Sequence, residues 1–375
     1  MQKVLFINHS RFLHGAETVM CQVIDSVFSS CKENVFVCQP SKYESVNEFQ
    51  EKLLENGYTQ LITLPYQNIG YGLPYSIRKI INNLYALIKL CFFVRKNNID
   101  VVFSNTSINF LGIMVATFTC KKHIWHFHES LPNEMWNTTL KVLYRILLRY
   151  KKNTSIFISE AQKKEWQSHL NFNFNNSIVI YNQIKPIVIA DSQENDNVLT
   201  FGYIGSWSTR KNIPFLIETF AELNKKHSKI KLVLNKYSGE QDEATLTVAR
   251  CIEKHKDSNI ISDVKYNDSS YFFSNIDVLL ITSFWESMSL VALEAMSVEK
   301  CVIMTDNNSG LHELFDDNVH CFFVDPENKE DLYNAMEKLL LNEKLRLSMA
   351  KNSYEKIKSY DFNRKFAESF NTLFS

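Results

Sequence analysis

The feature that most constrains this chain is a repeated alternation of short apolar runs with longer amphipathic segments. Strands are predicted over 3–8, 34–39, 60–64, 100–104, 123–127, 155–159, 177–181, 198–205, 230–235, 259–261, 278–282, 301–305 and 321–324. Helices are predicted over 16–30, 43–56, 75–97, 107–119, 135–150, 160–169, 212–226, 240–255, 289–298, 310–316 and 328–341. Continuously apolar strands have no solvated face, so the pattern predicts an α/β fold whose parallel sheets are covered by helices on both sides.

The alternation is interrupted once, near the middle of the chain. A polar stretch at 190–197 follows the first series of strands, and the pattern then restarts. A length of 375 residues also exceeds what one hydrophobic core ordinarily serves. We therefore expect two Rossmann-like domains, 1–190 and 191–355, with a cleft between the carboxyl ends of their strands. A helical tail follows, and its last part, 356–375, is expected to pack back on the N-terminal domain.

Composition excludes several classes of protein. The 41 basic and 41 acidic residues cancel, so no net field attracts nucleic acid. The charge is nevertheless split, with 20 basic minus 12 acidic residues giving +8 before residue 191, and 21 minus 29 giving −8 after it. The eight cysteines form no CxxC pair, which is typical of reduced core residues. The apolar run at 84–94 is shorter than the roughly 20 residues of a membrane span. A cytoplasmic protein is expected.

The loop after the strand at 278–282 carries the strongest candidate residues. Ser289 is a good N-cap, so the backbone N–H groups of Ser289, Leu290 and Val291 are predicted to form an anion site suited to a diphosphate. Glu294 lies one turn inside the helix and is placed to accept hydrogen bonds from ribose hydroxyls. Glu286, in the loop itself, would face whatever the diphosphate carries. The alternative is a first-turn carboxylate and a solvated loop acid.

The loop after the strand at 198–205 is the second candidate. Gly205 allows a tight turn, and Arg210 and Lys211 bring two positive charges into an acidic half of the chain. A lysine at a strand-to-helix loop can neutralise a departing phosphate. A surface lysine that completes the start of a helix remains the alternative.

Two loops of the first half are further candidates. Gly15 and Ala16 permit close approach of backbone to a ligand, but the single glycine argues against a dinucleotide-binding GxGxxG loop. Alternation along the strand at 123–127 places His126 and His128 on one face, with Glu129 just beyond. Zinc is disfavoured there, so no metal is expected; a His–Glu pair that orients one imidazole, or plain packing, are the alternatives.

Taken together, these motifs resemble the retaining family-4 glycosyltransferases of GT-B fold. The matching segments are the Glu-x7-Glu spacing of Glu286 and Glu294, Gly205 with Lys211-Asn212, His14-Gly-Ala-Glu17, His128-Glu129, the turn 308–313 and Val324-Asp-Pro326. Three segments depart from the family pattern: Ser287-Met-Ser289, Ser206 and 235–239.

The resemblance implies roles for the candidate residues. Glu294 would bind the ribose, and Lys211 with the amides of Ser289 and Leu290 would hold the nucleotide diphosphate. Arg210 stands as a substitute for the arginine that the family often has at 206. Glu286 and His128 would face the donor sugar as catalytic residues. Gly15 would approach the phosphates or the acceptor. No cofactor or metal is implied besides the nucleotide-sugar donor.

Two basic and apolar segments bear on partners. The helix around 77–91 spaces its apolar residues at i, i+3, i+4, and the stretch 141–152 surrounds Leu147 and Leu148 with basic residues. One expectation is that either segment rests on an anionic membrane that carries a lipid-linked acceptor, at the inner face of the cell membrane. The alternative is that the first segment is a sheet-packing helix and the second a solvated basic face.

The resulting functional hypothesis is a retaining hexosyltransferase-type enzyme that moves a sugar from a nucleotide sugar to a glycan or lipid-linked saccharide, in surface polysaccharide biosynthesis. A GT-B sugar-nucleotide epimerase and a catalytically silent assembly partner are the alternatives.

Overall fold

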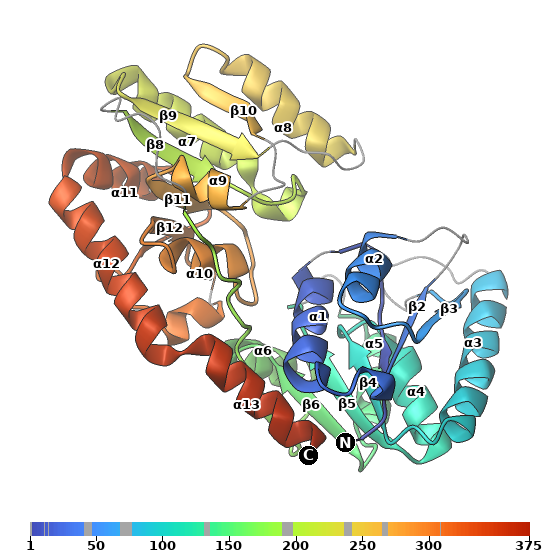
Figure 1. The fold of residues 1–375 in the computed structure, drawn as a ribbon. Coiled ribbons are helices and arrows are strands. Elements are labelled where there is room, and N and C mark those ends of the chain that lie inside the picture. Colours follow the sequence, from blue (N-terminus) through green and yellow to red (C-terminus); the bar gives the residue numbers. More distant parts are fainter. Residues whose placement is uncertain are drawn as a thin grey trace. The chain divides into compact units, whose positions relative to one another are not determined.

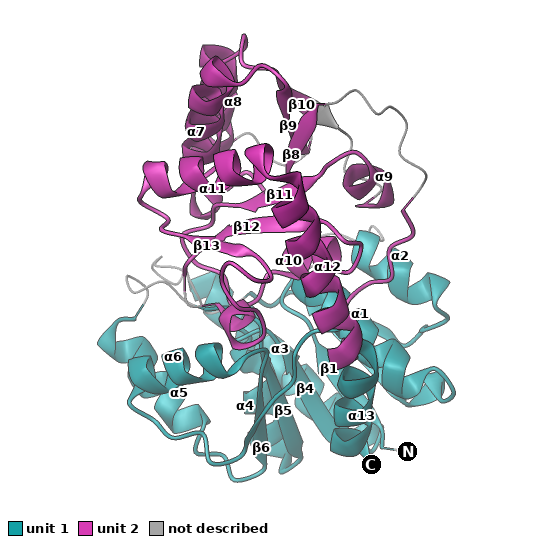
Figure 2. Cartoon of the chain, turned by 90° about the vertical axis from the view of Figure 1, so that its left-hand side faces the viewer, with its two compact units in different colours: residues 1–183, 363–375 teal, residues 184–362 magenta. Residues whose placement is uncertain are grey.

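A computed structural model describes residues 2–10, 12–13, 15–40, 47–67, 77–130, 136–189, 198–235, 242–264, 269–307 and 309–375. The chain forms two compact units (Figures 1 and 2). Unit 1 comprises Met1–Gln183 and Asn363–Ser375, and unit 2 comprises Ile184–Phe362. The predicted linker at 190–197, and His14 and Asn308 of the predicted motifs, lie outside the described residues.

Unit 1 is a parallel sheet covered by helices. Its strands are β1 (Val4–Ile7), β2 (Val35–Pro40), β3 (Leu61–Leu64), β4 (Val101–Asn105), β5 (Lys122–Phe127), β6 (Asn153–Phe157) and β7 (Ser177–Val179). Its helices are α1 (Gly15–Phe28), α2 (Glu48–Glu55), α3 (Ile77–Lys96), α4 (Phe110–Thr119), α5 (Thr138–Leu147), α6 (Glu160–Leu170) and α13 (Phe362–Phe374), with a 3-10 turn at Lys32–Asn34. The strand order is β3-β2-β1-β4-β5-β6-β7.

Alternation along the strands divides the core of unit 1 into two sides. Leu5, Ile7 and Val102 pack with residues of α3 and α4, while Trp125 and Phe127 pack with residues of α5 and α6. The alternate residue Phe6 turns the other way and contacts Phe28 of α1. Because each face has its own helices, central strands such as β1 and β4 are buried along their whole length, whereas the edge strands β3 and β7 are only partly buried.

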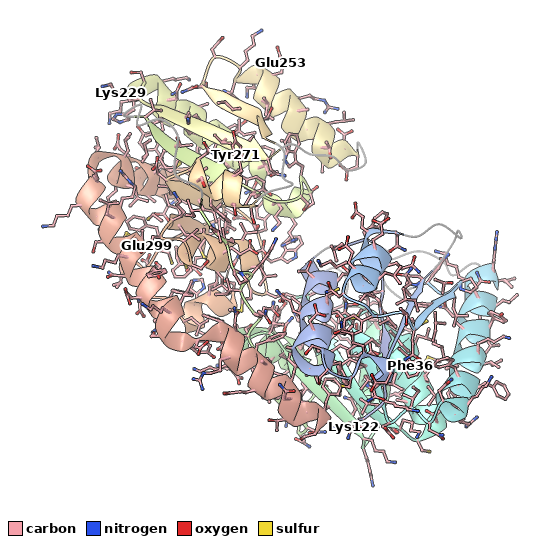
Figure 3. All side chains as sticks on the ribbon, viewed as in Figure 1. Phe36, Lys122, Lys229, Glu253, Tyr271 and Glu299 are labelled. Carbon is pink, nitrogen blue, oxygen red and sulfur yellow. The ribbon has the colours of Figure 1, made fainter. Side chains whose placement is uncertain are left out.

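Helix α13 completes the α1 side of this sheet. Its four phenylalanines, Phe362, Phe366, Phe370 and Phe374, recur every four residues and are all buried. The ring of Phe374 lies 6.2 Å from that of Phe6 and 5.2 Å from that of Phe28. Lys122, labelled in Figure 3, donates to the carbonyl of Leu373 at 2.6 Å. Asp361, with a left-handed φ of 53°, separates this helix from α12.

Unit 2 repeats the same architecture. Its strands are β8 (Leu199–Tyr203), β9 (Ile230–Asn235), β10 (Ile260–Val264), β11 (Val278–Ile281), β12 (Cys301–Thr305) and β13 (Phe322–Val324). Its helices are α7 (Ile213–Lys226), α8 (Glu243–Lys254), α9 (Ser269–Ser274), α10 (Leu290–Met296), α11 (Lys329–Leu341) and α12 (Glu343–Tyr360), with 3-10 turns at Thr209–Lys211 and Gly310–Glu313. The order β10-β9-β8-β11-β12-β13 is parallel throughout.

In both sheets the strand order reverses beside the first strand. The reversal falls between β1 and β4 in unit 1 and between β8 and β11 in unit 2. Open α/β sheets bind ligands outside the carboxyl ends of the strands at such a point. The loops after these four strands are therefore the places where a site is expected in each unit. The α/β fold with two Rossmann-like units and a helical tail is confirmed.

Three local predictions need correction. The predicted helix at 310–316 is only a 3-10 turn, and α9 was not predicted because its six residues are too few to show a helical period. The predicted helix at 289–298 is shorter, seven residues ending at Met296. In α3, Leu87 and Cys91 are buried in the core beside the sheet of unit 1, whereas the apolar residues at the same spacing nearer its start, and Ile88, are at least half exposed, so only part of that face packs on the sheet.

Candidate active site

The turn after β8 is held by a reciprocal pair of hydrogen bonds. The backbone N–H of Gly205 donates to Oδ1 of Asn235 at 3.0 Å, and Nδ2 of Asn235 donates to the carbonyl of Gly205 at 3.0 Å. A Cβ atom at Gly205 would lie 2.9 Å from the hydroxyl oxygen of Tyr203. That hydroxyl is itself fixed, since it donates to the carbonyl of Ser206 at 2.9 Å. Glycine is thus required here by lack of space.

The loops after β8 and β11 bring three predicted residues together on one carboxylate. Lys211 donates from Nζ to Oε1 of Glu286, and Nη1 of Arg210 lies 3.0 Å from the same oxygen. Ser283, which the sequence analysis did not single out, donates from its hydroxyl to that oxygen at 2.8 Å. One buried carboxylate oxygen therefore holds two cationic side chains in place.

Backbone contacts fix the two loops against each other. The N–H of Phe284 donates to the carbonyl of Arg210 at 2.9 Å, and the hydroxyl of Thr282 donates to the carbonyl of Lys211 at 2.9 Å. Arg210 also donates from Nη1 to the carbonyl of Trp285 at 2.9 Å. The cluster is a consequence of the neighbouring positions of β8 and β11 in the sheet.

The protonation of this cluster follows from burial and pairing. Burial alone would raise the pKa of Glu286, but Lys211 and Arg210, with the hydrogen bonds from Lys211 and Ser283, bring it below its usual value. Burial lowers the pKa of Lys211, and its attraction to Glu286 offsets part of that effect. One guanidinium and one ammonium group give two positive charges against the single negative charge of the carboxylate. The cluster therefore has a net charge of about +1, which attracts an anionic ligand.

Helix α10 begins where the sequence predicted. Ser289 is its N-cap and accepts from the N–H of Ala292 at 3.4 Å. The N–H groups of Leu290 and Val291 belong to the first turn, where intrahelical acceptors are lacking. Burial raises the pKa of Glu294 to about 7, and Lys185 opposes that rise. A carboxylate desolvated in this way gains from hydrogen-bond donors such as ribose hydroxyls.

In unit 1 a chain of amides holds one imidazole. Nδ2 of Asn105, at the end of β4, donates to Oδ1 of Asn8 at 2.9 Å, so Oδ1 of Asn105 faces Nε2 of His128 at 2.9 Å. The proton on His128 is therefore assigned to Nε2, which leaves Nδ1 as an acceptor. Burial, with His126 and His9 nearby, holds the pKa of His128 well below its usual value. A neutral imidazole can accept a hydrogen bond from a sugar hydroxyl.

The predicted His–Glu pair at this site is wrong. Glu129 accepts from the N–H of Ser107 at 3.0 Å and from its hydroxyl at 2.9 Å. Its carboxylate therefore binds the loop that follows β4. The ring of His126 does lie on the same face as that of His128, with centroids 3.9 Å apart. An imidazole–carboxylate pair exists instead between His9 and the buried Glu17, at 2.9 Å. Asn105 is the residue that orients His128.

Gly15 provides a direct test of close ligand approach. A Cβ atom built on it meets nothing within 4 Å, so the fold itself does not require glycine there. We expect Gly15→Ala to leave the melting temperature unchanged or slightly higher, because alanine favours a helix. If the ligand contacts this backbone, kcat/KM falls. A loss of stability together with activity would contradict this separation, and wild-type kinetics would show that no ligand approaches Gly15.

Sequence reasoning missed Asn8, Asn105, Asn235 and Ser283. Each of them lies at or just after the carboxyl end of a strand, namely β1, β4, β9 and β11. That position was a usable signal. The amide side chains were passed over because asparagine is common in loops for reasons of turn geometry alone.

One group of possible metal ligands occurs among the described residues. Glu218, Cys251 and His255 bring ligand atoms within 4.8 Å of one another. They lie on or beside α7 and α8, not in the loops after β8 and β11. Glu218 is also 3.5 Å from the ammonium of Lys254. Among the described helices, none is long and apolar enough to cross a membrane.

Comparison with known proteins finds glycosyltransferases among the similar sequences. The chain is 24% identical over 289 residues to an uncharacterized glycosyltransferase of Haemophilus influenzae, covering 75% of this chain and 77% of that protein. It is 20% identical to the N-acetylgalactosamine-N,N'-diacetylbacillosaminyl-diphospho-undecaprenol 4-alpha-N-acetylgalactosaminyltransferase of Campylobacter jejuni, covering 96% of both.

Solved structures agree with the fold. The structure of HepE from Anabaena in complex with UDP and glucose has a TM-score of 0.78 and 17% identity, covering 98% of this chain and 99% of that one. The lipopolysaccharide glycosyltransferase WaaG has a TM-score of 0.68 and 16% identity, covering 98% and 99%. Residues 185–356 match the family described as glycosyl transferases group 1. Through that segment, which is somewhat less than half of the chain, the protein is similar to the group 1 glycosyltransferases, and over its whole length it has the fold of GT-B structures.

Proposed function

We propose that the protein transfers a hexose-type sugar from a nucleoside diphosphate sugar to a glycan or lipid-linked saccharide, with retention of anomeric configuration, in surface polysaccharide synthesis. The observation that carries the proposal is that Arg210 and Lys211 both form ion pairs with Glu286, at the point where the strand order of unit 2 reverses. Cations fixed at that edge are suited to a bound diphosphate. The HepE complexes with UDP and the diphospho-undecaprenol in the name of the Campylobacter enzyme support this choice of substrates.

In this proposal the cations act on the leaving group. Breaking the bond between the sugar and the nucleotide leaves negative charge on the diphosphate, and Lys211 with Arg210 stabilises that charge. In the free enzyme Glu286 positions both cations. When the bound diphosphate replaces Glu286 as the partner of Lys211, the Glu286 carboxylate faces the sugar. Glu294 accepts hydrogen bonds from the ribose. No metal is required by this account, because the positive charge comes from side chains.

Unit 1 supplies the neutral His128 in the same proposal. Its Nδ1 accepts a hydrogen bond from a hydroxyl of the donor sugar, and Asn105 keeps the proton on Nε2. A charged imidazolium would instead add positive charge near the anomeric centre, where positive charge develops in glycosyl transfer. The low pKa of His128 keeps it neutral throughout the physiological range.

The test is a panel of sugar nucleotides assayed with the full-length protein. Thermal shift identifies the nucleotide that binds, and chromatography of the products then shows what happens to it. Slow release of the free sugar supports a transferase, and the configuration of the glycosidic bond formed with an acceptor, read by NMR, decides retention. An epimerised sugar nucleotide would overturn the proposal in favour of an epimerase. The assay is repeated with a membrane extract that supplies lipid-linked acceptors, and binding of the sugar nucleotide without turnover there would favour a catalytically silent assembly partner.

A further inference from the structure

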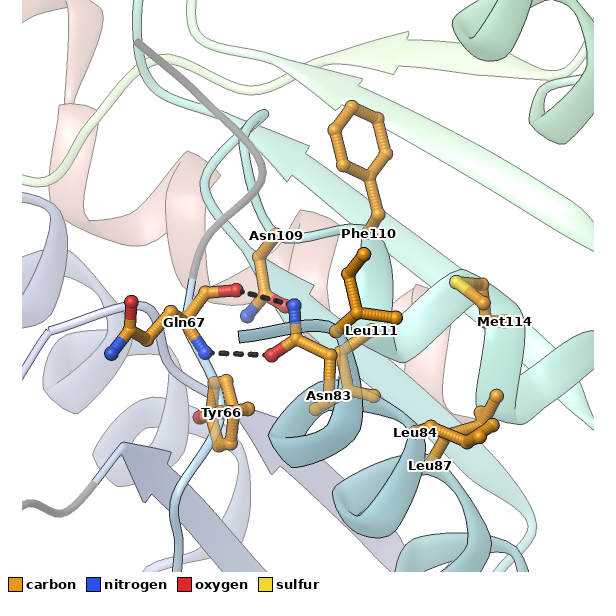
Figure 4. A pocket seen from close by; sticks show the side chains of 10 residues that line it. Tyr66, Gln67, Asn83, Leu84, Leu87, Asn109, Phe110, Leu111 and Met114 are labelled. Carbon is orange, nitrogen blue, oxygen red and sulfur yellow. Dashed lines mark hydrogen bonds between the residues drawn. The ribbon is translucent and has the colours of Figure 1, made fainter. Parts of the chain in front are cut away.

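Unit 1 contains an apolar pocket that the reaction does not use. It has a volume of about 430 Å³, within the range of roughly 300–1,000 Å³ usual for ligand pockets. Leu84 and Leu87 of α3 and Leu111 and Met114 of α4 line it (Figure 4), and Ile80 of α3 is also part of the lining. Leu87 and Leu111 are buried at its floor, whereas Ile80 and Leu84 are each more than half exposed at its rim. The pocket is therefore open and lined mainly by hydrocarbon.

The backbone of Gln67 and the side chains of Asn83 and Asn109 in the pocket lining are hydrogen-bonded within the protein. Asn83 donates to the carbonyl of Gln67 at 2.9 Å and accepts from its N–H at 2.8 Å, as Figure 4 shows. Nδ2 of Asn109 donates to the carbonyl of Ile7 at 2.8 Å. A sugar or nucleotide would leave its own hydroxyl groups unsatisfied against such walls, at a cost of about 1–3 kcal/mol each. The lining thus favours an apolar occupant.

The apolar surface continues from the pocket along α3. Ile77, Ile81, Ile88 and Phe92 are each at least half exposed and recur at helical spacing. Over fifteen residues the stripe is about 22 Å long. Single exposed apolar residues are ordinary, but a contiguous stripe beside a pocket marks an interaction surface.

The charges of α3 are of one sign. Its ionisable side chains, apart from tyrosine and cysteine, are Arg78, Lys79, Lys89, Arg95 and Lys96, and the helix contains no acidic residue. An apolar surface with an exclusively basic border complements a ligand that combines hydrocarbon with phosphate. It does not complement a neutral apolar peptide, which would leave these cations without counter-charge.

The pocket leads toward the polar cluster of unit 1. Tyr66, in its wall, donates from its hydroxyl to the carbonyl of Asn8. The side chain of Asn8 accepts from Asn105, which in turn faces His128. Hydrocarbon lining and the residues that hold His128 are thus joined by two hydrogen bonds through Asn8.

We propose that this pocket binds the hydrocarbon chain of a lipid-linked acceptor, next to its phosphate group, with the α3 stripe against the membrane that carries it. The inference rests on the proposed function and narrows it, because it selects the lipid-linked saccharide over a free glycan. The occupant is the prenyl or polyprenyl phosphate of the acceptor itself, and an ordinary membrane phospholipid is the alternative that the test separates.

The experiment uses the full-length protein and geranylgeranyl monophosphate as a probe, measured by calorimetric titration. Leu84→Asp places a carboxylate at the rim of the pocket, where the exposed position tolerates it in the fold. Ile77→Asp, on the same stripe but outside the pocket lining, is the matched control. We expect Leu84→Asp to weaken binding of the probe at least about tenfold, since a carboxylate would be desolvated beside the chain. Ile77→Asp should bind the probe like the wild type.

A second variant and a second ligand complete the test. Met114→Trp fills the pocket and should abolish probe binding, and an unchanged thermal melting profile of the full-length protein checks that unit 1 is still folded. Vesicles of phosphatidylcholine with phosphatidylglycerol form the other arm, read by co-sedimentation. If both aspartate variants lose vesicle binding and neither changes affinity for the probe, the surface contacts phospholipid only and the pocket proposal is overturned.

Failure of the pocket and failure of the proposed function are distinguishable. A wild-type protein that turns over a sugar nucleotide but does not bind geranylgeranyl monophosphate keeps the function and loses the pocket. A protein that binds the probe in a Leu84-dependent manner but has no activity on any sugar nucleotide keeps the pocket and loses the transferase proposal.

Discussion

Replacing Glu294 with glutamine is expected to stabilise the free protein at pH 8 and to weaken nucleotide binding at least about tenfold. The weakening follows because a hydrogen bond from a ribose hydroxyl to a carboxylate contributes about 1.5–3 kcal/mol, against about 0.5–1.5 kcal/mol for one to a neutral amide, and two hydroxyls are available. The stabilisation follows because burial raises the pKa of Glu294 to about 7 from 4.5, which makes ionisation unfavourable in the folded state. Glutamine cannot ionise and avoids that cost.

The direction of this pKa shift determines whether the stability of the protein rises or falls with pH. Between pH 4.5 and about 7 the folded state holds the proton more tightly than the unfolded state, so the wild type loses stability as the pH rises through that window. Above about pH 7 the loss is complete. The difference in melting temperature between Glu294→Gln and the wild type should therefore be largest at pH 8 and vanish near pH 4.5.

Two measurements check this prediction. Thermal melts from pH 4.5 to 8 give the stability difference, and calorimetric titration with UDP at pH 8 gives the affinity. Glu299→Gln is the matched control, since Glu299 is exposed just beyond the end of α10 and should change neither quantity. Nucleotide affinity of the wild type should also fall as the pH falls through about 7. A Glu294→Gln protein that binds UDP like the wild type would show that Glu294 does not contact the ribose.

The second large effect concerns Lys211 and Glu286. We expect Lys211→Met to lower the free energy of unfolding by about 3–5 kcal/mol, because a buried carboxylate loses its main partner. Transfer activity should fall by about 10² to 10³ in kcat, as when a group that stabilises the leaving charge is removed. Because the double variant Lys211→Met, Glu286→Gln no longer buries an unpaired charge, it should recover most of the stability and none of the activity.

Urea unfolding of both single variants and the double variant measures the coupling. A comparable substitution in an exposed pair, Lys226→Met beside Glu337, is the control and should change stability little. If the losses from Lys211→Met and Glu286→Gln simply add in the double variant, the two side chains do not act on each other and the model of the cluster is incorrect. Recovery of activity along with stability would exclude Lys211 from the chemistry.

The sequence predicted the parts of the site that local patterns encode. Ser289 was recognised as an N-cap because a serine before an apolar helical run has few other local uses. His126 and His128 were placed on one face because side chains alternate along a strand, and the centroids of their rings do lie 3.9 Å apart. These inferences need only the geometry of a single element.

Contacts between different strands and helices could not be predicted from the sequence in the same way. That Glu286 holds both Arg210 and Lys211 depends on β8 and β11 being neighbours in the sheet, although 75 residues separate Lys211 from Glu286. The error over Glu129 has the same origin: adjacency in sequence suggested a partner for His128, while the neighbouring strand β4 supplied Asn105. Hydrogen-bond partners at the end of a parallel strand come from other strands.

The exposed face of α3 shows the opposite limitation. Its apolar period predicted burial or a membrane equally well, because periodicity reports a face and not what covers it. The structure leaves that face open and opens a pocket beside it.

By itself, then, the sequence determined the two α/β units, their strands and helices, and the loops that carry reactive residues, because apolar period and capping act within a few residues along the chain. Only the tertiary structure decided which loop residues meet, which imidazole is held neutral and which helix face stays uncovered. Those outcomes depend on strand order and on burial, and both are set by contacts between residues far apart in sequence.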